Sequence, residues 1–181
     1  MANWLTFLGA YIKDPKNIGA ITPTSRYVAR RVIRQIPATA RTIVEYGPGN
    51  GAVTLPVLKG MPRSAKLIAI ERNPAFVETL KKVRSAKLQV VHGNAQDAAK
   101  YAKKPDVILS ALPFNSFPES LKHEILANTA KNMRKDSKFV VYLQYSRVLE
   151  DYLPQYFSAI EHEYEPRNLP PSHLYICSGP R

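Results

Sequence analysis

Five short apolar runs recur between residues 42 and 145, and they constrain the fold more than any other feature of the sequence. The runs cover residues 42–47, 66–71, 88–93, 106–112 and 138–145, and the segments around them favour helices at residues 51–60, 74–84, 117–133 and 147–157. Strands that are apolar on both faces and alternate with helices are typical of a parallel sheet covered on both sides. The pattern therefore predicts an α/β fold.

The end of the chain departs from this alternation. Two further strand candidates, residues 158–164 and 173–178, are separated only by residues 165–172. Parallel neighbours need a crossover of a dozen or more residues, so we expect this last pair to be antiparallel.

The length of 181 residues suits a single domain, residues 1–181. We expect an N-terminal helical segment over residues 1–40, with an amphipathic helix at residues 3–13 and a second helix at residues 25–35. Residues 41–181 then form the core of the domain. No apolar run approaches the roughly 20 residues of a membrane-spanning helix, and the N-terminus lacks the basic region and cleavage site of a secretory signal. We therefore expect a cytoplasmic protein, either soluble or attached to a membrane surface.

Cysteine and histidine usage narrows the classes of site. Cys177 is the single cysteine, which excludes an intramolecular disulfide and a cysteine-rich zinc site. No Gly-x-Ser-x-Gly elbow of a serine hydrolase occurs. The histidines show no metal-ligand spacing, so we expect no metal; they are His92, His123, His162 and His173.

The positive charge is unevenly distributed. The whole chain carries +12, but residues 1–105 hold eighteen basic and five acidic residues, whereas residues 106–181 hold eight basic and nine acidic residues. The first part therefore carries +13 and the second −1. Such a field favours a polyanionic partner, either nucleic acid or an anionic lipid surface. A basic protein without such a partner is the alternative.

The end of the first predicted strand carries a glycine-rich turn. The sequence reads Glu45-Tyr-Gly47-Pro-Gly49-Asn-Gly51 and continues into a predicted helix. Glycines at this spacing allow a tight turn and the close approach of a ligand to main-chain N–H groups. In open parallel sheets, ligands bind beyond the carboxyl ends of the strands.

The next three strand ends also suit a nucleoside. The second strand ends in Glu71, whose carboxylate can accept both hydroxyls of a ribose. The third ends in Gly93-Asn94-Ala95-Gln96-Asp97, which offers an amide and a carboxylate to an adenine amino group, and the fourth ends in Ser110-Ala-Leu-Pro-Phe114. The order of these side chains predicts a nucleoside site.

A dinucleotide-dependent oxidoreductase is one reading of this site, because Gly47-x-Gly49-x-x-Ala52 also satisfies the dinucleotide fingerprint. Three features count against it. Glu45 stands two positions before the first glycine, where it suits an ammonium better than a pyrophosphate. The chain has one glycine-rich turn and no length for a separate catalytic domain, and its antiparallel last pair departs from a dinucleotide-binding half.

The ordered set resembles the class I S-adenosylmethionine-dependent methyltransferases over nearly all of residues 40–181. The resemblance implies a Rossmann-like, seven-stranded, mostly parallel sheet with an antiparallel last strand and helices on both faces. It also implies S-adenosylmethionine as cofactor and S-adenosylhomocysteine as product. The ribose would lie at Glu71, the methionine moiety near Glu45 and the glycine turn, and the adenine between Arg72 and Asn94. The implied cofactor-binding residues are Glu45, Gly47, Gly49, Gly51, Glu71, Arg72, Asn94, Ala95 and Leu112.

Two branches of these enzymes compete. The ribosomal RNA adenine dimethylases carry Asn-Leu-Pro-Tyr after the fourth strand, where this chain has Ala111-Leu112-Pro113-Phe114. The bacterial phospholipid N-methyltransferases are similar to this chain from end to end, in the segments at residues 19–25, 110–118 and 167–172. This resemblance implies methyl transfer to the amine of a phospholipid such as phosphatidylethanolamine. The alternative is an RNA adenine-N6 or small-molecule amine methyltransferase, and no protein partner can be inferred.

Aromatic and basic residues suggest how a lipid head group would be held. Aromatic rings stabilise a methylammonium by cation–π contact, and Arg147 with Asn168 or His173 would hold the phosphate. The aromatic face of residues 3–13 suits a membrane interface, and a lid over the cofactor is the alternative. Basic residues of the second helix would contact lipid phosphates, or equally form a solvated face; they are Arg26, Arg30, Arg31 and Arg34. The candidate catalytic residues are Tyr27, Phe114, Tyr145, Arg147 and Tyr175.

Overall fold

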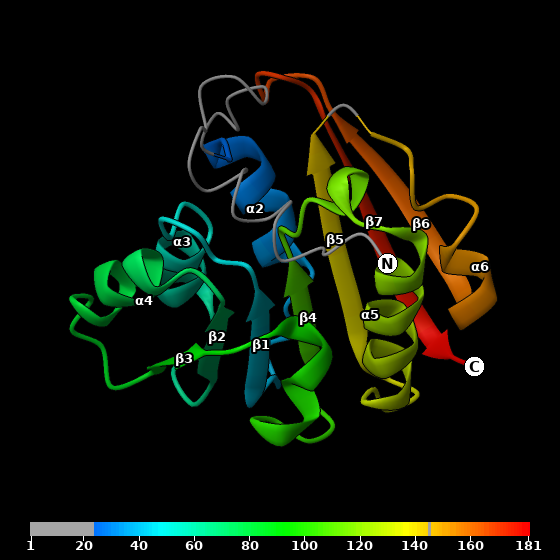
Figure 1. Ribbon diagram of the computed structural model, residues 1–181. Helices are drawn as coiled ribbons and strands as arrows, with labels where there is room; N and C mark the ends of the chain where they lie inside the picture. The colour runs from blue at the N-terminus through cyan, green and yellow to red at the C-terminus, as the bar shows by residue number, and fades with distance from the viewer. Residues whose placement is uncertain (1–23, 145) are drawn as a thin grey trace.

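The computed structural model describes residues 24–144 and 146–181. In this part of the chain, seven strands form one sheet (Figure 1). The strands are β1 (Thr42–Tyr46), β2 (Lys66–Glu71), β3 (Leu88–His92), β4 (Val107–Ser110), β5 (Lys138–Gln144), β6 (Phe157–Glu165) and β7 (Ser172–Pro180). Their order in the sheet is β3-β2-β1-β4-β5-β7-β6. Strands β1 to β5 pair in parallel, and β7 runs antiparallel to both β5 and β6, which confirms the predicted fold.

Seven helical elements accompany the sheet in the described ranges. They are α2 (Arg26–Arg34), α3 (Thr54–Gly60), α4 (Pro74–Lys81), α5 (Glu119–Lys131) and α6 (Leu153–Tyr156), with the 3-10 helices η1 (Ala95–Lys100) and η2 (Phe114–Ser116). Local sequence sets where the helices begin. Helix α2 begins after Ser25, whose side chain accepts a hydrogen bond from the backbone of Val28, and α4 begins after Asn73, which caps Ala75.

The helix predicted over residues 147–157 is wrong in extent, because only Leu153–Tyr156 is helical. Pro154 explains the difference. Proline lacks a backbone N–H and is tolerated only in the first turn of a helix. A helix that contains Pro154 must therefore begin just before it, and the chain ahead of Leu153 forms turns instead.

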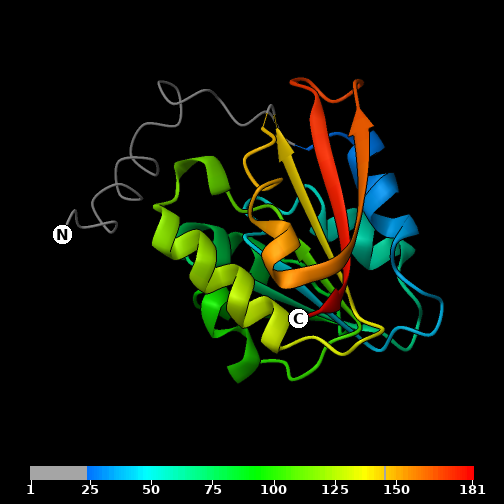
Figure 2. The same cartoon turned by 90° about the vertical axis from the view of Figure 1, so that its right-hand side faces the viewer.

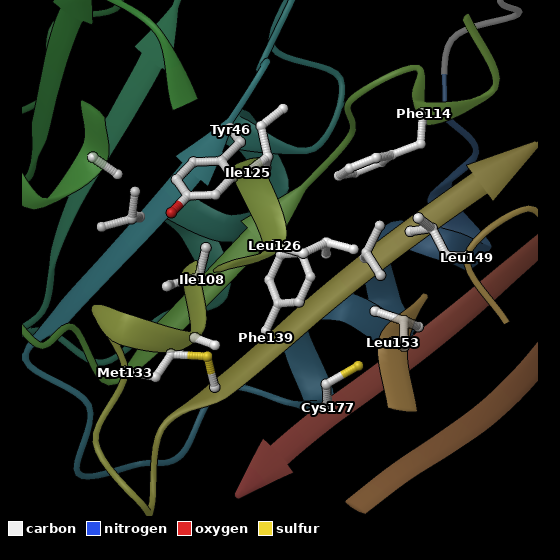
Figure 3. Packing of buried hydrophobic residues seen from close by; sticks show 14 of the residues in the cluster. Tyr46, Ile108, Phe114, Ile125, Leu126, Met133, Phe139, Leu149, Leu153 and Cys177 are labelled. Atoms are coloured by element: carbon white, nitrogen blue, oxygen red, sulfur yellow. The ribbon is translucent and has the colours of Figure 1, made fainter. Parts of the chain in front are cut away.

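The two faces of the sheet carry separate apolar clusters. Helix α5 covers one face, where Leu126 packs over Phe139 of β5 (Figure 3). Helices α2 and α3 cover the opposite face, where Val28 and Val32 lie in the cluster that includes Ile43 of β1; Figure 2 shows the two layers on either side of the sheet. The expectation that every strand is buried on both faces is wrong for the edge strands β3 and β6, which have exposed positions.

Two sequence expectations fall outside the described residues: the helix at residues 3–13 and the catalytic candidate Tyr145. Of the predicted segment 1–40, the described part contains α2, which packs on the sheet. None of the helices in the described ranges is long and apolar enough to cross a bilayer.

Candidate active site

The glycine-rich turn lies at the carboxyl end of β1 and depends on left-handed backbone. The φ angles of Gly47, Gly49 and Gly51 are 65°, 56° and 86°, a region that side chains other than glycine rarely adopt. A Cβ at Gly47 would lie 2.9 Å from Cδ2 of Leu112, so the turn also packs closely on the loop after β4. A Cβ at Gly49 would meet nothing within 4 Å. The turn is therefore open at Gly49, where a ligand can approach the backbone.

Glu71 fastens this turn to the end of β2. One carboxylate oxygen accepts a hydrogen bond from the backbone N–H of Gly49 at 3.0 Å. The other accepts from the N–H groups of Arg72 and Asn73 at 2.8 and 2.7 Å. The structure thus brings Glu71 to the glycine turn, as the sequence predicts, and its carboxylate holds the turn in shape.

Glu45 stands in β1 two residues before Gly47 and is fully buried. Its Oε2 accepts a hydrogen bond from the Thr54 hydroxyl at 2.8 Å, whereas Oε1 is buried without a hydrogen-bond partner among the described residues. Burial, with a smaller contribution from the charge of Glu71, raises the pKa of Glu45 from 4.5 to about 7. A buried carboxylate oxygen without a donor fits an ammonium group, such as that of the methionine moiety of S-adenosylmethionine.

Tyr142 is a site residue that sequence reasoning missed. It comes from β5 and lies in the apolar cluster under α2 and α3, and its buried hydroxyl has no partner in the described part of the chain. Burial and the charge of Glu45 raise the pKa of Tyr142 well above its usual value. The signal was a single hydroxyl inside an otherwise apolar strand, which requires a partner when buried.

The predicted adenine-side residues follow β2 and β3, which pair at their carboxyl ends through Glu71 and His92. The imidazole Nε2 of His92 lies 3.0 Å from the carbonyl oxygen of Arg72, and partial burial lowers the pKa of Arg72. Asn94 precedes η1 in extended backbone, without a side-chain capping bond, and Ala95 packs against the core. These residues lie at the ends of two paired strands, as the sequence implied.

The candidate catalytic residues do not form one group. Phe114 is fully buried in the core, with its ring 5.7 Å from that of Phe117. Tyr175 and Arg147 are brought together by Glu150, which sequence reasoning missed: the Tyr175 hydroxyl donates to Oε1 of Glu150 at 3.0 Å, and Nε of Arg147 donates to the same oxygen at 2.7 Å.

Two histidines adjoin Tyr175 on the paired strands β6 and β7. The ring of His162 stacks on Tyr175 with centroids 4.8 Å apart, and its Nε2 lies 2.8 Å from Nδ1 of His173. Tyr27 lies on α2, where the guanidinium groups of Arg26 and Arg167 are 5.1 and 4.2 Å from its ring centroid.

Asn168 does not fit the phosphate-holding role considered for it. The residue is buried. Its Oδ1 accepts from the backbone N–H of Ser25 at 2.8 Å, and its Nδ2 donates to the carbonyl of Pro170 at 2.6 Å. Its amide thus joins the turn between β6 and β7 to the start of α2. As for metals, the described residues contain no group of three or more metal-ligating side chains close enough to hold an ion.

Sequence comparison extends these observations. The family model of ribosomal RNA adenine dimethylase matches residues 8–146. An ornithine lipid N-methyltransferase of Singulisphaera acidiphila is 28% identical over 187 residues, covering 99% of this chain and 97% of that protein. A ribosomal RNA small subunit methyltransferase A of Leifsonia xyli subsp. xyli is 30% identical over 139 residues, covering 67% of this chain but 49% of that protein.

Solved structures show the same fold. A TehB-like S-adenosylmethionine-dependent methyltransferase of Corynebacterium glutamicum has a TM-score of 0.66 at 17% identity, covering 98% of this chain and 100% of that one. A 16S rRNA methyltransferase of T. thermophilus, solved with AdoMet and guanosine, has a TM-score of 0.68 at 19% identity, covering 90% of this chain and 44% of that one. The protein therefore belongs to the ribosomal RNA adenine dimethylase family and is a class I S-adenosylmethionine-dependent methyltransferase.

Proposed function

We propose that the protein transfers a methyl group to the amine of a lipid head group, with a phospholipid such as phosphatidylethanolamine as substrate. The observation that carries the proposal is the extent of the two kinds of match. The match to the ornithine lipid N-methyltransferase takes in nearly the whole of both chains, whereas the chain spans about half the length of the Leifsonia RNA enzyme. This chain is therefore long enough to contain whatever the lipid enzyme contains.

The loop after β4 supports a lipid amine over an RNA adenine. Alanine at position 111 has no side-chain group to hold an adenine amino group, and it packs against the apolar cluster under α2. Phe114, which would stack on a base, is fully buried instead. Recognition of an extruded base needs both hydrogen bonds to its edge and a stacking surface. Ala111 and Phe114, the two residues best placed in the sequence for those contacts, therefore provide neither the hydrogen bond nor the stacking surface.

The glycine turn and its two carboxylates would hold S-adenosylmethionine. Glu45 offers Oε1 to the ammonium of the methionine moiety, and a positive charge there favours the ionised form of this carboxyl. Glu71 would accept the ribose hydroxyls while it keeps the turn in place, and Asn94 would meet the adenine. The bound cofactor supplies a methyl group already activated on a sulfonium, so the protein's task is to place a neutral amine in line with that bond.

The lipid amine must lose a proton before it can attack. Burial disfavours the charged form of an amine and lowers its pKa, so a pocket that excludes water favours the neutral nucleophile. Aromatic rings near the amine would stabilise the methylammonium that forms. Tyr27 and Tyr145 remain the candidates for that task, because Tyr175 is buried with its hydroxyl bonded to Glu150. Arg147 and His173 remain the candidates for the phosphate.

The test uses methyl-labelled S-adenosylmethionine, the purified protein, and vesicles of phosphatidylethanolamine with phosphatidylglycerol. We expect label in the organic extract, at the mobility of methylated phosphatidylethanolamine on thin-layer plates. Glu71→Ala removes the acceptor of three backbone bonds and should abolish transfer. Glu78→Ala is the matched control, because this glutamate is exposed and pairs with Lys81 on the surface of α4. An unlabelled extract from protein that binds the cofactor in a calorimeter would contradict the proposal.

A further inference from the structure

The turn between β6 and β7 exposes an apolar side chain. Leu169 is 78% exposed, whereas the other large hydrophobic residues that count as exposed in the described ranges reach at most 49%. Leaving a leucine in water forgoes the free energy of its burial. A single exposed leucine needs no explanation by itself. Leu169 differs from such a residue in the hydrogen bonds that hold its turn and in the cations on the neighbouring segments.

The turn is held firmly on both sides of Leu169. Asn168 is buried and bonds both to the start of α2 and to Pro170, as described above. On the strand side, the backbone N–H and the guanidinium of Arg167 bond to the buried carboxylate of Glu165. Hydrogen bonds therefore hold the residues on both sides of Leu169 in place, while its own side chain faces solvent.

Cationic side chains lie on the two segments next to Leu169, which we call the tip of the turn: the turn itself and the start of α2, to which Asn168 is bonded. The guanidinium of Arg167 lies 4.2 Å from the ring centroid of Tyr27, and that of Arg26 lies 5.1 Å from it on α2. Arg26 and Arg30 are exposed, stand four residues apart on the same face of α2, and form no ion pair with a described carboxylate. A tyrosine with an apolar ring and a polar tip is typical of a membrane–water interface.

The expectation that Arg31 contacts lipid phosphates with the other arginines of α2 is wrong. Arg31 forms ion pairs with Glu163 and Glu165 of β6. Those carboxylates raise the pKa of Arg31 further. The cations left to face an anionic surface beside the tip are thus Arg26 and Arg30, with Arg34 one turn further along α2.

The tip lies at the edge of the sheet that carries the active site. Ser172, the first residue of β7, pairs with Gln144 at the carboxyl end of β5, and β5 runs parallel with β4 and β1. Figure 2 shows the turn beside the arrowhead of β5. A surface that receives the tip would therefore face the carboxyl ends of the strands, where the glycine turn lies.

We propose that the β6–β7 turn is a membrane-docking element, in which Leu169 enters an anionic bilayer while Arg26 and Arg30 contact lipid phosphates. The inference rests on the proposed function and deepens it, because this docking would turn the active-site edge toward lipid head groups. An exposed aliphatic side chain favours a bilayer over RNA, which binds stacking aromatic rings and cations instead.

Cysteine labelling tests the docking directly. Leu169→Cys carries an environment-sensitive thiol dye, and the native Cys177 does not react, because it is buried and burial raises its pKa to about 12. Asp136→Cys is the matched control, since this exposed residue lies just before the amino-terminal end of β5, at the opposite end of that strand from the β6–β7 turn. On addition of phosphatidylethanolamine–phosphatidylglycerol vesicles, the dye at 169 should shift to the blue and be quenched by nitroxide-labelled lipid, while the dye at 136 should not respond.

A binding measurement on the unlabelled protein gives a second readout. Leu169→Asp should weaken co-sedimentation with the same vesicles about tenfold or more, the factor expected from losing a buried leucine side chain. Ile160→Asp changes a half-exposed apolar residue within β6 and should leave vesicle binding unchanged. No response at 169 from vesicle-bound protein, or a dye response to structured RNA in place of vesicles, would overturn the docking proposal.

The same variants distinguish a failure of membrane docking from a failure of the proposed lipid methylation. Leu169→Asp should still methylate phosphatidylethanolamine dispersed in detergent, where docking is not required, and lose transfer on vesicles. Equal rates on vesicles for this variant and the unaltered protein would refute docking and leave lipid methylation standing. Insertion of residue 169 into vesicles, with no lipid methylated in either form, would refute the proposed function and leave the docking element standing.

Discussion

Glu45 should make the protein less stable as pH rises. In the folded protein its pKa is about 7 rather than 4.5, because the carboxyl is fully buried with one oxygen lacking a donor. As the pH rises, the unfolded chain therefore loses this proton at a lower pH than the folded protein does. The stabilising effect of the raised pKa is fully present below pH 4.5 and is lost as pH rises through about 7. At about 1.4 kcal/mol per pH unit, the difference between a pKa of about 7 and one of 4.5 corresponds to about 3.5 kcal/mol.

The perturbation that isolates this effect is Glu45→Gln. The amide oxygen can still accept the hydrogen bond of the Thr54 hydroxyl, but the side chain no longer titrates. Urea unfolding followed by circular dichroism, without cofactor, gives the free energy of unfolding of both proteins at pH 5 and pH 8. From pH 5 to pH 8, we expect the free energy of unfolding of the variant to rise by about 2 to 3 kcal/mol relative to that of the unaltered protein. A difference that is the same at both would refute the assignment of a raised pKa to Glu45.

The same variant should bind S-adenosylmethionine less well, because a neutral amide replaces the carboxylate offered to the ammonium. Loss of a charge-assisted bond predicts affinity about tenfold weaker by calorimetry at pH 8. Unaltered affinity would show that the ammonium does not bind at Glu45.

Three further outcomes follow from the packing and the ion pairs. Gly47→Ala should cost about 1 to 2 kcal/mol in urea unfolding, because its φ is 65° and the new Cβ would lie 2.9 Å from Leu112; an unchanged midpoint would contradict this. Phe114→Ala should cost about 3 to 5 kcal/mol by leaving a cavity in the core, and a loss of activity at unchanged stability would restore Phe114 to the substrate site. The pKa of Glu165 is held to about 2 by Arg167 and Arg31, so its contribution is present above pH 4.5 and is lost as pH falls toward 2; acid unfolding of Glu165→Gln should lack this component.

The order of strands and the glycine turn could be predicted because both are encoded locally. Apolar runs separated by helical stretches leave few arrangements other than a covered parallel sheet, and glycines after the first strand mark the left-handed backbone found at Gly47 and Gly49. The position of Glu71 at the next strand end then follows from the fold, since parallel strands end at one edge.

What could not be predicted depends on partners distant in the sequence. The contact of Arg31 with β6 joins residues 132 and 134 positions apart, and nothing near Arg31 distinguishes it from the exposed Arg30. Likewise, Phe114 follows a strand end, where an aromatic ring can face either ligand or core, and the helices beside it decide that it is buried. The short α6 was predictable, because Pro154 stands inside the helix predicted over residues 147–157.

One reaction tests the central claim directly. The protein is given methyl-labelled S-adenosylmethionine in the presence of both phosphatidylethanolamine–phosphatidylglycerol vesicles and unmethylated ribosomal RNA, and the label is then counted in the organic extract and in the precipitated RNA. A lipid amine methyltransferase places the label in the organic extract, loses it with Glu71→Ala and keeps it with Glu78→Ala. Label in the RNA and none in the lipid would contradict the account.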